Sequence, residues 1–574
     1  MYALGVNHAY HETAACLVHD GRILAAAEEE RFTRVKHGKA ARVDNPHELP
    51  VNAIDYCLEE AGITLADVDH IGSSILPAKR LRNSVFTDLV AAGDWGGPGG
   101  ETTFYDHLQT VPARLREMGF QGRFHWLSHH LCHAASAYYP APFDRAAVLA
   151  VDGIGETAST MVALGESTRL SPSMEISYPA SIGFLWEKIA KYLGFSEYDA
   201  CKVMGLAAYG DPAPYRDHYR HILKLLPDGQ FSLDNDVLRF RMDDYSGLTD
   251  LFGLGPRPPR GGMSSDYADI TAALQAATDD VMLHLARHAA RSLGTRNLCM
   301  AGGVALNCVA NGRIAATGWF DNLYIQPAAH DAGTALGAAL LIWHHVLGGP
   351  ERDEMRHAHY GPHFTEAAIE AALQEHGAVY KRVDDMAGEV ARLLADQKIV
   401  GWFQGRMEFG PRALGNRSLL ADPRHPAMRE RLNRVVKNRE DFRPFAPSVL
   451  AEHARQWFDI PTPSRASDFM LVGYRALQPE KIAAVVHIDG TSRIQTVHAD
   501  LNPRFHQLIS HFHRITGIPL VLNTSFNDRE PIVCTPADAI TTLHRANIDY
   551  LAIGDFLVEP PPTGPGHSAA MSSR

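Results

Sequence analysis

The pattern of apolar and polar positions at the start of the chain predicts a β-meander. Residues 3–6 and 13–18 are short apolar or mixed runs, and residues 23–27 form a third. Asp20-Gly21, between the second and third runs, is a strong signal for a two-residue hairpin turn. We therefore expect three short strands, of which the second and third are joined by a tight turn.

Further along, apolar runs alternate with segments of helical periodicity. Residues 270–293 carry apolar positions at a period near 3.6, which predicts a helix with one apolar face. A second unit of the same kind begins near residue 366. Strands mixed with helices favour the α/β class. The further predicted strands cover residues 146–151, 298–300, 323–325, 399–403 and 520–522.

Three segments interrupt this pattern. Residues 245–262 are rich in glycine and proline and are predicted to form a long loop. Residues 352–360 are charged and polar, which is typical of a connector, and residues 560–574 have so little to bury that we expect disorder. These breaks predict a domain of residues 1–351, a connector of residues 352–365, a second domain of residues 366–559 and a tail.

Composition narrows the class of protein. The 574 residues are enough for two to four structural units, and 45% hydrophobic with 21% charged residues excludes a wholly disordered, collagen-like or coiled-coil chain. The longest apolar run, residues 335–343, is too short to span a membrane. The N-terminus lacks the basic segment of a secretory signal, and the seven cysteines contain no CxxC pair. We therefore expect reduced thiols, no membrane partner and a cytoplasmic protein.

The charge is unevenly distributed along the chain. The formal net charge is −12, but residues 404–443 hold ten basic and five acidic residues, so this stretch is +5 and the remainder −17. One basic pocket in an acidic protein favours a small polyanion over a nucleic-acid duplex, which needs an extended basic face. A solvated basic helix would have the same composition.

Two histidines and two aspartates form a candidate metal site. His129 and His133 are four residues apart, so on a helix both imidazoles share one face and can bind one ion. Asp152 follows the apolar run 146–151, and Asp331 follows a predicted strand and precedes a run of small residues. Two imidazoles and two carboxylates suit iron or zinc better than Mg²⁺. The histidine spacing alone also fits ordinary surface or core histidines.

Glycine supplies a second signal. Gly302-Gly303 follows a predicted strand and leads to Asn307. Glycine lets a backbone approach a nucleotide, and a strand-to-helix turn offers N–H groups to anions. A tight turn without a ligand has the same signature.

A third signal is the set of arginines in the basic stretch. Arg412 lies in GRMEFGPRALGNRS, and Lys437 and Arg443 follow in VVKNREDFRPF. Guanidinium groups match phosphate oxygens in pairs, so several converging arginines offset a triphosphate. Arg493, Asn523 and Ser525 are predicted to complete this pocket.

These residues stand in longer motifs that resemble the O-carbamoyltransferases of the NodU/CmcH type, which modify nodulation factors, cephalosporins and aminoglycosides. The resemblance runs over about residues 2–558. Its motifs are YHETAACLVHDGRILAAAEEERFTRVKHG, HHLCHAASA, VDGIGE, KVMGLAAYGDP, AGGVALN, HDAGTALGAA, GRMEFGPRALGNRS, FRPFAPSVL and NTSFN.

The resemblance implies a fold and a reaction. The first domain is expected to be actin/sugar-kinase-like, of the TsaD type, and the second to be a YrdC-like α/β domain. The second domain would combine ATP, as its Mg²⁺ complex, with carbamoyl phosphate and yield carbamoyladenylate, pyrophosphate and phosphate. The carbamoyl group would then pass to a hydroxyl of a small acceptor, such as an antibiotic or other secondary metabolite, at a metal site in the first domain.

The resemblance also assigns roles to residues. Fe(II) or another divalent transition metal would be bound by His129, His133, Asp152 and Asp331. His11 matches the catalytic histidine, and an imidazole suits the task of accepting the hydroxyl proton; a structural hydrogen bond is the alternative. Nucleotide contacts in the first domain are expected from Lys202, Gly205, Gly302, Gly303 and Asn307, and ATP and carbamoyl phosphate contacts in the second from Arg412, Lys437, Arg443, Arg493, Asn523 and Ser525.

The chain departs from the family pattern at two places. The HDAS-like segment of the family reads His11-Glu12-Thr13 here, and Asp199-Ala200-Cys201 stands before Lys202 where the family often has Glu-Tyr. The Gly/Pro-rich loops of residues 80–103 and 243–266 are expected to shape the acceptor pocket. The resemblance favours a homodimer.

Three other functions fit parts of the sequence. A metallohydrolase would use the histidine pair, but the segment lacks the acid of HExxH. A non-catalytic nucleotide sensor would bind ligands without turnover. Carbamoyl transfer to tRNA is disfavoured by the acidic remainder of the chain, so no nucleic-acid partner is expected.

Overall fold

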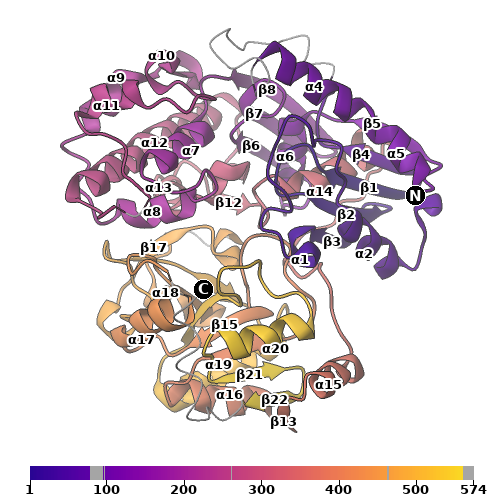
Figure 1. The fold of residues 1–574 in the computed structure, drawn as a ribbon, viewed down its shortest axis with the longest axis vertical. Coiled ribbons are helices and arrows are strands. Elements are labelled where there is room, and N and C mark those ends of the chain that lie inside the picture. Colours follow the sequence, from indigo (N-terminus) through magenta and orange to yellow (C-terminus); the bar gives the residue numbers. More distant parts are fainter. Residues whose placement is uncertain (78–94, 96, 260, 438, 462–464, 560–574) are drawn as a thin grey trace.

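The computed structural model of the chain describes residues 1–77, 95, 97–259, 261–437, 439–461 and 465–559 (Figure 1). The tail of residues 560–574, for which we predict disorder, lies outside these residues. None of the helices they form has both the length and the apolar character that crossing a bilayer requires.

In the described part of residues 1–350, two five-stranded sheets share one topology. In each sheet three strands form an antiparallel meander, and the first of them pairs in parallel with a fourth strand that pairs in parallel with a fifth. One sheet contains β1 (Tyr2–Asn7), β2 (Ala14–His19), β3 (Arg22–Glu28), β4 (His70–Ser73) and β5 (Arg123–Trp126). The other contains β6 (Arg145–Val151), β7 (Ala158–Glu166), β8 (Arg169–Ser177), β11 (Asn297–Ala301) and β12 (Asn322–Ile325).

This duplicated topology confirms the α/β class and the actin/sugar-kinase-like expectation for the first part of the chain. The predicted meander is also confirmed, because His19 of β2 pairs with Arg22 of β3 across the two-residue turn. The helices that accompany the two sheets are α1 (Glu30–Thr33), α2 (Val51–Ala61), α4 (Pro98–Gln109), α5 (Val111–Glu117), α6 (His129–Tyr138), α7 (Ile182–Tyr192), α8 (Ala200–Ala207), α9 (Arg216–Ile222), α10 (Asn235–Leu238), α11 (Ser246–Phe252), α12 (Ser265–Ser292), α13 (Cys308–Ala316) and α14 (Ala332–Leu341), and a small hairpin is formed by β9 (Leu223–Leu225) and β10 (Phe231–Leu233).

Helix α14 consists largely of small residues and is buried along its whole length. A Cβ atom at Gly337 would stand 1.8 Å from the carbonyl oxygen of Cys132 in α6, and a Cβ at Gly5 of β1 would stand 1.8 Å from that of Ala335 in α14. Glycine at both positions therefore lets the backbones of β1, α14 and α6 come into direct contact. This packing fixes the N-terminus of α14, where Asp331 lies, against the face of α6 that carries the two histidines.

Replacing Gly337 with alanine is expected to destabilise the protein by more than about 1–3 kcal/mol, because the new methyl group overlaps backbone that cannot move without shifting a helix. The shift also separates α6 from α14, so the protein is expected to bind less transition metal. Thermal unfolding and metal analysis check both effects. Gly255→Ala is the control, since a Cβ there meets open space; equal melting temperatures for the two variants would contradict the packing argument.

The rest of the chain, salmon-red through orange to yellow in Figure 1, is built on one mixed sheet. In the described residues its strand order is β13-β22-β21-β14-β15-β20-β16-β19. The strands are β13 (Val379–Arg382), β14 (Val400–Phe403), β15 (Arg417–Ala421), β16 (Ala446–Leu450), β19 (Gln495–Val497), β20 (Leu520–Ser525), β21 (Tyr550–Ile553) and β22 (Phe556–Glu559), with β17 (Gly473–Arg475) and β18 (Thr491–Arg493) as a separate pair. The helices are α15 (Glu366–Glu375), α16 (Met386–Ala395), α17 (Pro426–Arg431), α18 (Ala454–Trp457), α19 (Pro503–Thr516) and α20 (Pro536–Arg545).

The predicted long loop of residues 245–262 is wrong in its first half. Helix α11 covers Ser246–Phe252 and ends at Gly253, whose φ of 65° is left-handed. Leu248 and Phe252, four residues apart, are its buried side chains and give the short helix one apolar face. Of the other loop expected to shape an acceptor pocket, residues 80–94 and 96 lie outside the described residues, and α4 begins at Pro98.

Candidate active site

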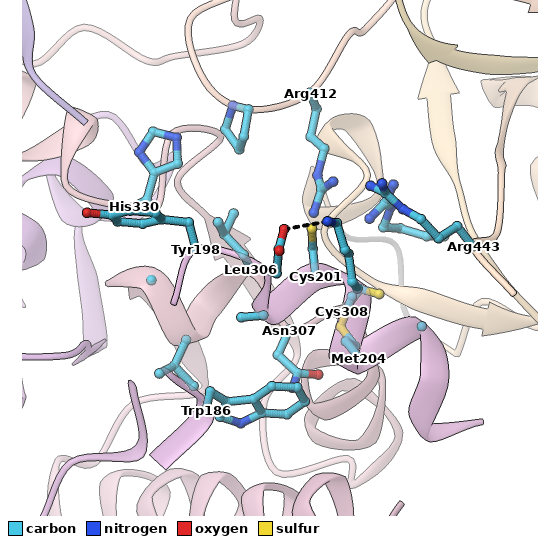
Figure 2. A pocket seen from close by; sticks show the side chains of 18 of the residues that line it. Trp186, Tyr198, Cys201, Met204, Leu306, Asn307, Cys308, His330, Arg412 and Arg443 are labelled. Atoms are coloured by element: carbon cyan, nitrogen blue, oxygen red, sulfur yellow. Dashed lines mark ion pairs between the residues drawn. The ribbon is translucent and has the colours of Figure 1, made fainter. Parts of the chain in front are cut away.

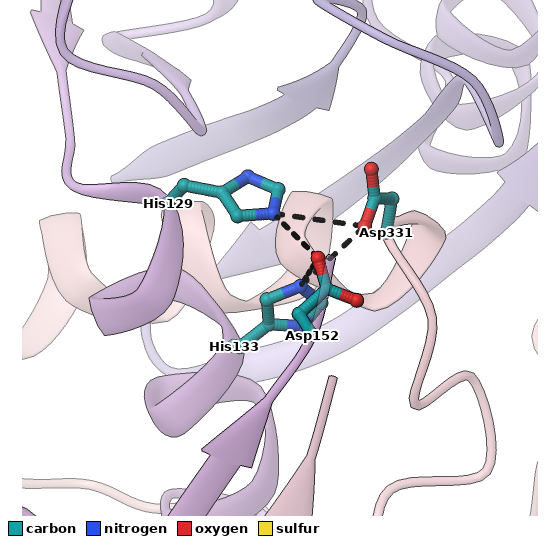
Figure 3. Close-up of side chains that lie close together, drawn as sticks. All are labelled: His129, His133, Asp152 and Asp331. Atoms are coloured by element: carbon teal, nitrogen blue, oxygen red, sulfur yellow. Dashed lines mark ion pairs between the residues drawn. The ribbon is translucent and has the colours of Figure 1, made fainter. Parts of the chain in front are cut away.

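The four predicted metal ligands lie together in the interior (Figure 3). His129 and His133 project from one face of α6, Asp152 follows β6 directly, and Asp331 precedes α14. The Nε2 atoms of the two histidines lie 3.5–3.8 Å from one carboxylate oxygen of each aspartate. The structure thus brings together four residues of which the first and last, His129 and Asp331, are 202 positions apart. Both aspartates follow strands, as expected from the sequence.

The donor set fits a transition metal. Four ligands placed tetrahedrally about 2.1 Å from one ion are separated by about 3.4 Å, which is close to the observed spacing. Both Nε2 atoms are buried and have no hydrogen-bond partner. The Nδ1 atom of His129 lies 3.1 Å from the carbonyl oxygen of Ser74 and donates to it, which leaves the Nε2 lone pair directed at the cluster.

The charges of the cluster call for a cation. Burial raises the pKa of Asp152, but the two imidazoles outweigh it and hold the net value well below its usual range. Burial lowers the pKa of His129, but Asp331 and Asp152 raise it to a net value well above the usual one. In the absence of a metal, a protonated His129 therefore balances part of the carboxylate charge, and a divalent cation that replaced this proton would pair with both carboxylates.

A cavity of about 1710 Å³ is lined by residues of both parts of the chain (Figure 2). Asp152 and Asp331 lie on its wall, so it reaches the metal cluster. Arg412 and Arg443, from the C-terminal part, lie on the opposite side of the view from Tyr198 and His330. Both predicted sites therefore open into the same space.

Four arginines line the cavity without a carboxylate partner among the described residues: Arg412, Arg439, Arg443 and Arg493. The Nε atoms of Arg412 and Arg493 are buried and have no hydrogen-bond partner. Burial and the neighbouring Arg493 and Arg443 lower the pKa of Arg412 to about 9. Because uncompensated buried charge is unfavourable, this cluster is suited to a polyanionic ligand.

Arg439 was not among the predicted site residues. It lies between Lys437 and Arg443 in the same motif, and that position was the signal available in the sequence. Its Nε donates to Asn433 at 2.7 Å, while one terminal nitrogen is buried without a partner. Burial and Arg443 lower its pKa to about 9.

Other members of the basic stretch hold the fold. Arg424 pairs with Asp422 at 2.6 Å and Arg431 with Asp549 at 2.8 Å. Arg417 is fully buried and donates to backbone carbonyls. The basic stretch is therefore neither one solvated helix nor one pocket. Some of its arginines line the cavity, and others form ion pairs and hydrogen bonds that hold the fold.

Lys437, Asn523 and Ser525 also line the cavity. The Lys437 ammonium donates to the carbonyl oxygen of Ser525 at 2.5 Å and to the backbone and side-chain oxygens of Asn527 at 2.7 Å. Asn523 donates to Ser448 at 2.9 Å, and its own side-chain oxygen is buried without a partner. Lys437 thus shapes the turn after β20, and Asn523 has an unused acceptor at the cavity.

The two predicted glycines have different positions. Gly303 lines the cavity, and its N–H donates to Asp152 at 2.7 Å, which orients this predicted metal ligand. Gly302 does not belong to the described cavity wall; its φ is 88°, and a Cβ there would stand 2.2 Å from the carbonyl oxygen of Val151. Gly302 therefore permits close backbone approach, as the tight-turn alternative held.

The remaining residues predicted to contact nucleotide lie on the same wall. Asn307 caps α13 and exchanges hydrogen bonds with Gln275 at 3.0 and 3.2 Å. Lys202 lies 3.0 Å from Asp199 and 3.9 Å from Glu440, so it reaches from the first part of the chain to the second. Gly205 is buried in α8 and faces Pro444.

Sequence reasoning also missed Asp279. It lies one helical turn after Gln275 on α12, is buried and lines the cavity. Its carboxylate accepts from Gln275 at 2.8 Å and lies 2.6 Å from Arg313. Burial raises its pKa to about 6, against the opposing charge of Arg313. Polar residues at helical spacing within an apolar pattern were the available signal.

His11 lies on the cavity wall in the turn between β1 and β2. Its Nδ1 atom is buried without a hydrogen-bond partner, and its ring meets Tyr198 edge-on at 5.2 Å between centroids. Glu12 has a left-handed φ of 53°, and its carboxylate lies 2.6 Å from His37. The glutamate that departs from the family pattern is therefore held by a histidine, beside an imidazole with a free ring nitrogen.

The fold and these sites define a two-part α/β protein in which a buried metal-type cluster and an arginine-lined anion pocket share one cavity. Residues 2–79 and 102–340 match the family description "Carbamoyltransferase N-terminus", and residues 391–560 match "Carbamoyltransferase C-terminus". The chain belongs to the carbamoyltransferase family and is a carbamoyltransferase.

Relatives extend over nearly the whole chain. An uncharacterized protein of Synechocystis is 40% identical over 97% of this chain and 96% of its own length. The nodulation protein NolNO of Sinorhizobium fredii is 38% identical over 96% of this chain and 79% of its own length. The 3'-hydroxymethylcephem-O-carbamoyltransferase of Streptomyces clavuligerus is 32% identical over 62% of this chain and 64% of its own length.

Solved structures match more distantly. A ROK hexokinase of Thermus thermophilus is 16% identical over 61% of this chain and 100% of its own, with a TM-score of 0.30.

Proposed function

We propose that this carbamoyltransferase makes carbamoyladenylate from ATP and carbamoyl phosphate in the arginine pocket and transfers the carbamoyl group to a hydroxyl of a small natural product near the metal cluster. The observation that carries the proposal is that the unpaired arginines and the His₂Asp₂ cluster open into one cavity. The named cephem O-carbamoyltransferase among the relatives supports the transfer to oxygen.

The first step needs a site for several phosphates. Water would displace phosphate from carbamoyl phosphate, and the carbamate oxygen formed would attack the α-phosphorus of Mg²⁺-bound ATP with release of pyrophosphate. Arg412, Arg439, Arg443 and Arg493 would bind these anions and offset the charge that develops on the leaving pyrophosphate. Lys437 would hold the turn after β20, and Asn523 and Ser525 would contact the carbamoyl group or the phosphates.

The second step needs a proton acceptor for the hydroxyl. The acceptor oxygen would attack the carbamoyl carbon, the bond to the AMP phosphate would break, and His11 would take the hydroxyl proton through its unpartnered ring nitrogen. Lys202, Gly205, Gly303 and Asn307 would line the path of the nucleotide. Gly302 would contribute indirectly, because its lack of a Cβ atom lets the turn pack against the backbone of Val151.

A divalent transition metal, Fe(II) being the family's usual one, would be held by His129, His133, Asp152 and Asp331. When bound, it would act as a Lewis acid toward the activated carbamoyl group. The chain's own residues fix its ligands: Gly303 orients Asp152, and Ser74 orients His129.

The deciding experiment follows radiolabelled carbamoyl phosphate with ATP, Mg²⁺ and metal-loaded protein, first without acceptor and then with a panel of hydroxylated natural products. We expect pyrophosphate and carbamoyladenylate in the first assay and a carbamoyl ester with AMP in the second. Binding without turnover would indicate the nucleotide sensor, and hydrolysis that needs the metal but not ATP would indicate the metallohydrolase. Labelled tRNA in place of a labelled small product would reassign the acceptor.

A further inference from the structure

The loop that carries Arg412 is held by the first part of the chain. Gly410 precedes Arg412 by two residues and has a left-handed φ of 117°. A Cβ atom at Gly410 would stand 2.9 Å from the carbonyl oxygen of Pro327, so the two backbones are in direct contact. Pro327 begins the short segment that leads to the metal ligand Asp331.

A buried ion pair between Glu28 and Arg31 contacts the same loop at Gly410. Glu28, at the end of β3, is 2% exposed, and Arg31, in α1, is 3% exposed. Arg31 donates to one Glu28 oxygen at 2.7 and 2.9 Å and to the carbonyl oxygen of Gly410 at 2.9 Å. The N–H of Gly410 lies 3.4 Å from that Glu28 oxygen. Both backbone groups of Gly410 therefore face one ion pair of the other part of the chain.

The pair also reaches the metal side of the cavity. The second oxygen of Glu28 lies 3.4 Å from Nε2 of His330, the residue before Asp331. Glu12, next to His11, offers its carboxylate to the same group, since ligand atoms of Glu12, Glu28 and His330 lie within 4.8 Å of one another. A continuous set of buried polar groups thus runs from the metal-ligand segment to the Arg412 loop.

Helix α1 holds a second wall of the anion pocket. Arg34, at the end of α1, donates to the carbonyl oxygens of Pro531 and Ile532 at 2.7 Å. These residues follow Asn527, which accepts from Lys437. One short helix therefore contacts both chain segments between which the phosphates would lie.

We infer that Glu28 and Arg31, which we call the Glu28–Arg31 clamp, are positioning residues that set the place of Arg412 in the anion pocket relative to the metal segment. Burying an ion pair contributes little to stability compared with apolar packing. This pair contacts both backbone groups of Gly410, two residues before Arg412, and it also reaches His330 through Glu28 and Glu30 through Arg31. The inference rests on the proposed use of ATP and carbamoyl phosphate.

The test compares Arg31→Met, Arg31→Lys and Glu28→Gln with the wild-type protein in pyrophosphate release. We expect kcat/KM for carbamoyl phosphate to fall about 10–100-fold in Arg31→Met, mainly through KM, since Arg412 is displaced but remains present. Arg31→Lys keeps the charge without the planar fork, so it is expected to recover part of the loss. Transition-metal content should stay at the wild-type level.

Arg424→Lys is the control for Arg31→Lys. Arg424 also pairs with a fully buried carboxylate, that of Asp422, and it lies in the same part of the chain as Arg412, but it is not among the residues that line the cavity. An equal loss of kcat/KM in Arg424→Lys, or wild-type KM in the clamp variants, overturns the inference. Binding of inorganic pyrophosphate by calorimetry gives a readout that needs no turnover. If the wild-type protein binds pyrophosphate but releases none from ATP, the proposed function fails. In that case, weaker pyrophosphate binding by Arg31→Met still supports the inference about the clamp. Pyrophosphate binding that is unchanged in Arg31→Met overturns the inference.

Discussion

The Asp331→Asn protein is expected to lose its transition metal and its carbamoyl-transfer activity while it still releases pyrophosphate from ATP. Asp331 supplies one of four ligand atoms, and a neutral amide is a much weaker ligand than a carboxylate. Since changes even behind the ligands cost 10–100-fold in metal affinity, we expect a loss of at least about 100-fold here. Metal analysis and separate assays of the two partial reactions measure the effect.

The substitution is a clean one for structural reasons. Asp331 precedes α14 but its side chain makes no capping hydrogen bond to the helix, so an asparagine of nearly the same shape does not remove a helix cap. His130→Asn is the control, because His130 is buried on the same helix, outside the cluster. A fully metallated, active Asp331→Asn protein would show that the four residues are not the ligands.

Arg412→Ala is expected to reduce pyrophosphate release by at least about 100-fold, the scale found when one preorganised charge-stabilising group is removed from an active site. Metal content should not change, because Arg412 does not belong to the cluster of His129, His133, Asp152 and Asp331. The ligand-free protein should be as stable as wild type or more so, since burial and two neighbouring arginines disfavour the Arg412 charge. Initial rates, thermal unfolding and metal analysis check the three expectations.

Arg434→Ala provides the comparison for charge alone. Arg434 belongs to the same basic stretch but is 60% exposed and pairs with Glu430 and Asp441. It should leave all three quantities unchanged. Should the two variants lose activity equally, the stretch would act through its overall charge and not through a pocket.

The four residues predicted from local patterns as metal ligands do lie together, while their binding of a metal stays a prediction. His129 and His133 share a helix face because of their spacing, and Asp152 and Asp331 lie where strands end, so each position follows from its own neighbourhood. Their meeting depends on β1, α14 and α6 packing together through Gly5 and Gly337. The small residues of α14 were visible in the sequence. Their packing against the backbones of β1 and α6 could not be predicted from it.

The anion pocket was less accessible to sequence reasoning. Ten basic residues occur in one stretch, and only tertiary partners such as Asp422 and Asp549 separate those that hold the fold from those that face the cavity. Arg439 was missed for this reason. The domain boundaries, the YrdC-like expectation and the homodimer stay predictions.

The duplication of the two sheets was implied by the family resemblance but not by the hydrophobic pattern, because strand pairing between distant segments leaves no repeat in the residues. The strands of the second sheet come from segments up to 180 positions apart, from Arg145 to Ile325. Hydrophobic runs predict strands one at a time and are silent on order.

Because the two sheets share one topology, equivalent positions in them can be compared. The first strand of each sheet ends in a polar residue: Asn7 closes β1, and Asp152 follows β6. The Asn7 amide donates to the carbonyl oxygens of His11 and Glu12 at 3.0 and 2.8 Å, whereas the Asp152 carboxylate lies 3.6 and 3.8 Å from the Nε2 atoms of His129 and His133. The two matching strand ends therefore differ in their partners. Asn7 stabilises a backbone turn, while Asp152 faces two imidazoles, which is the arrangement that the proposed metal site requires.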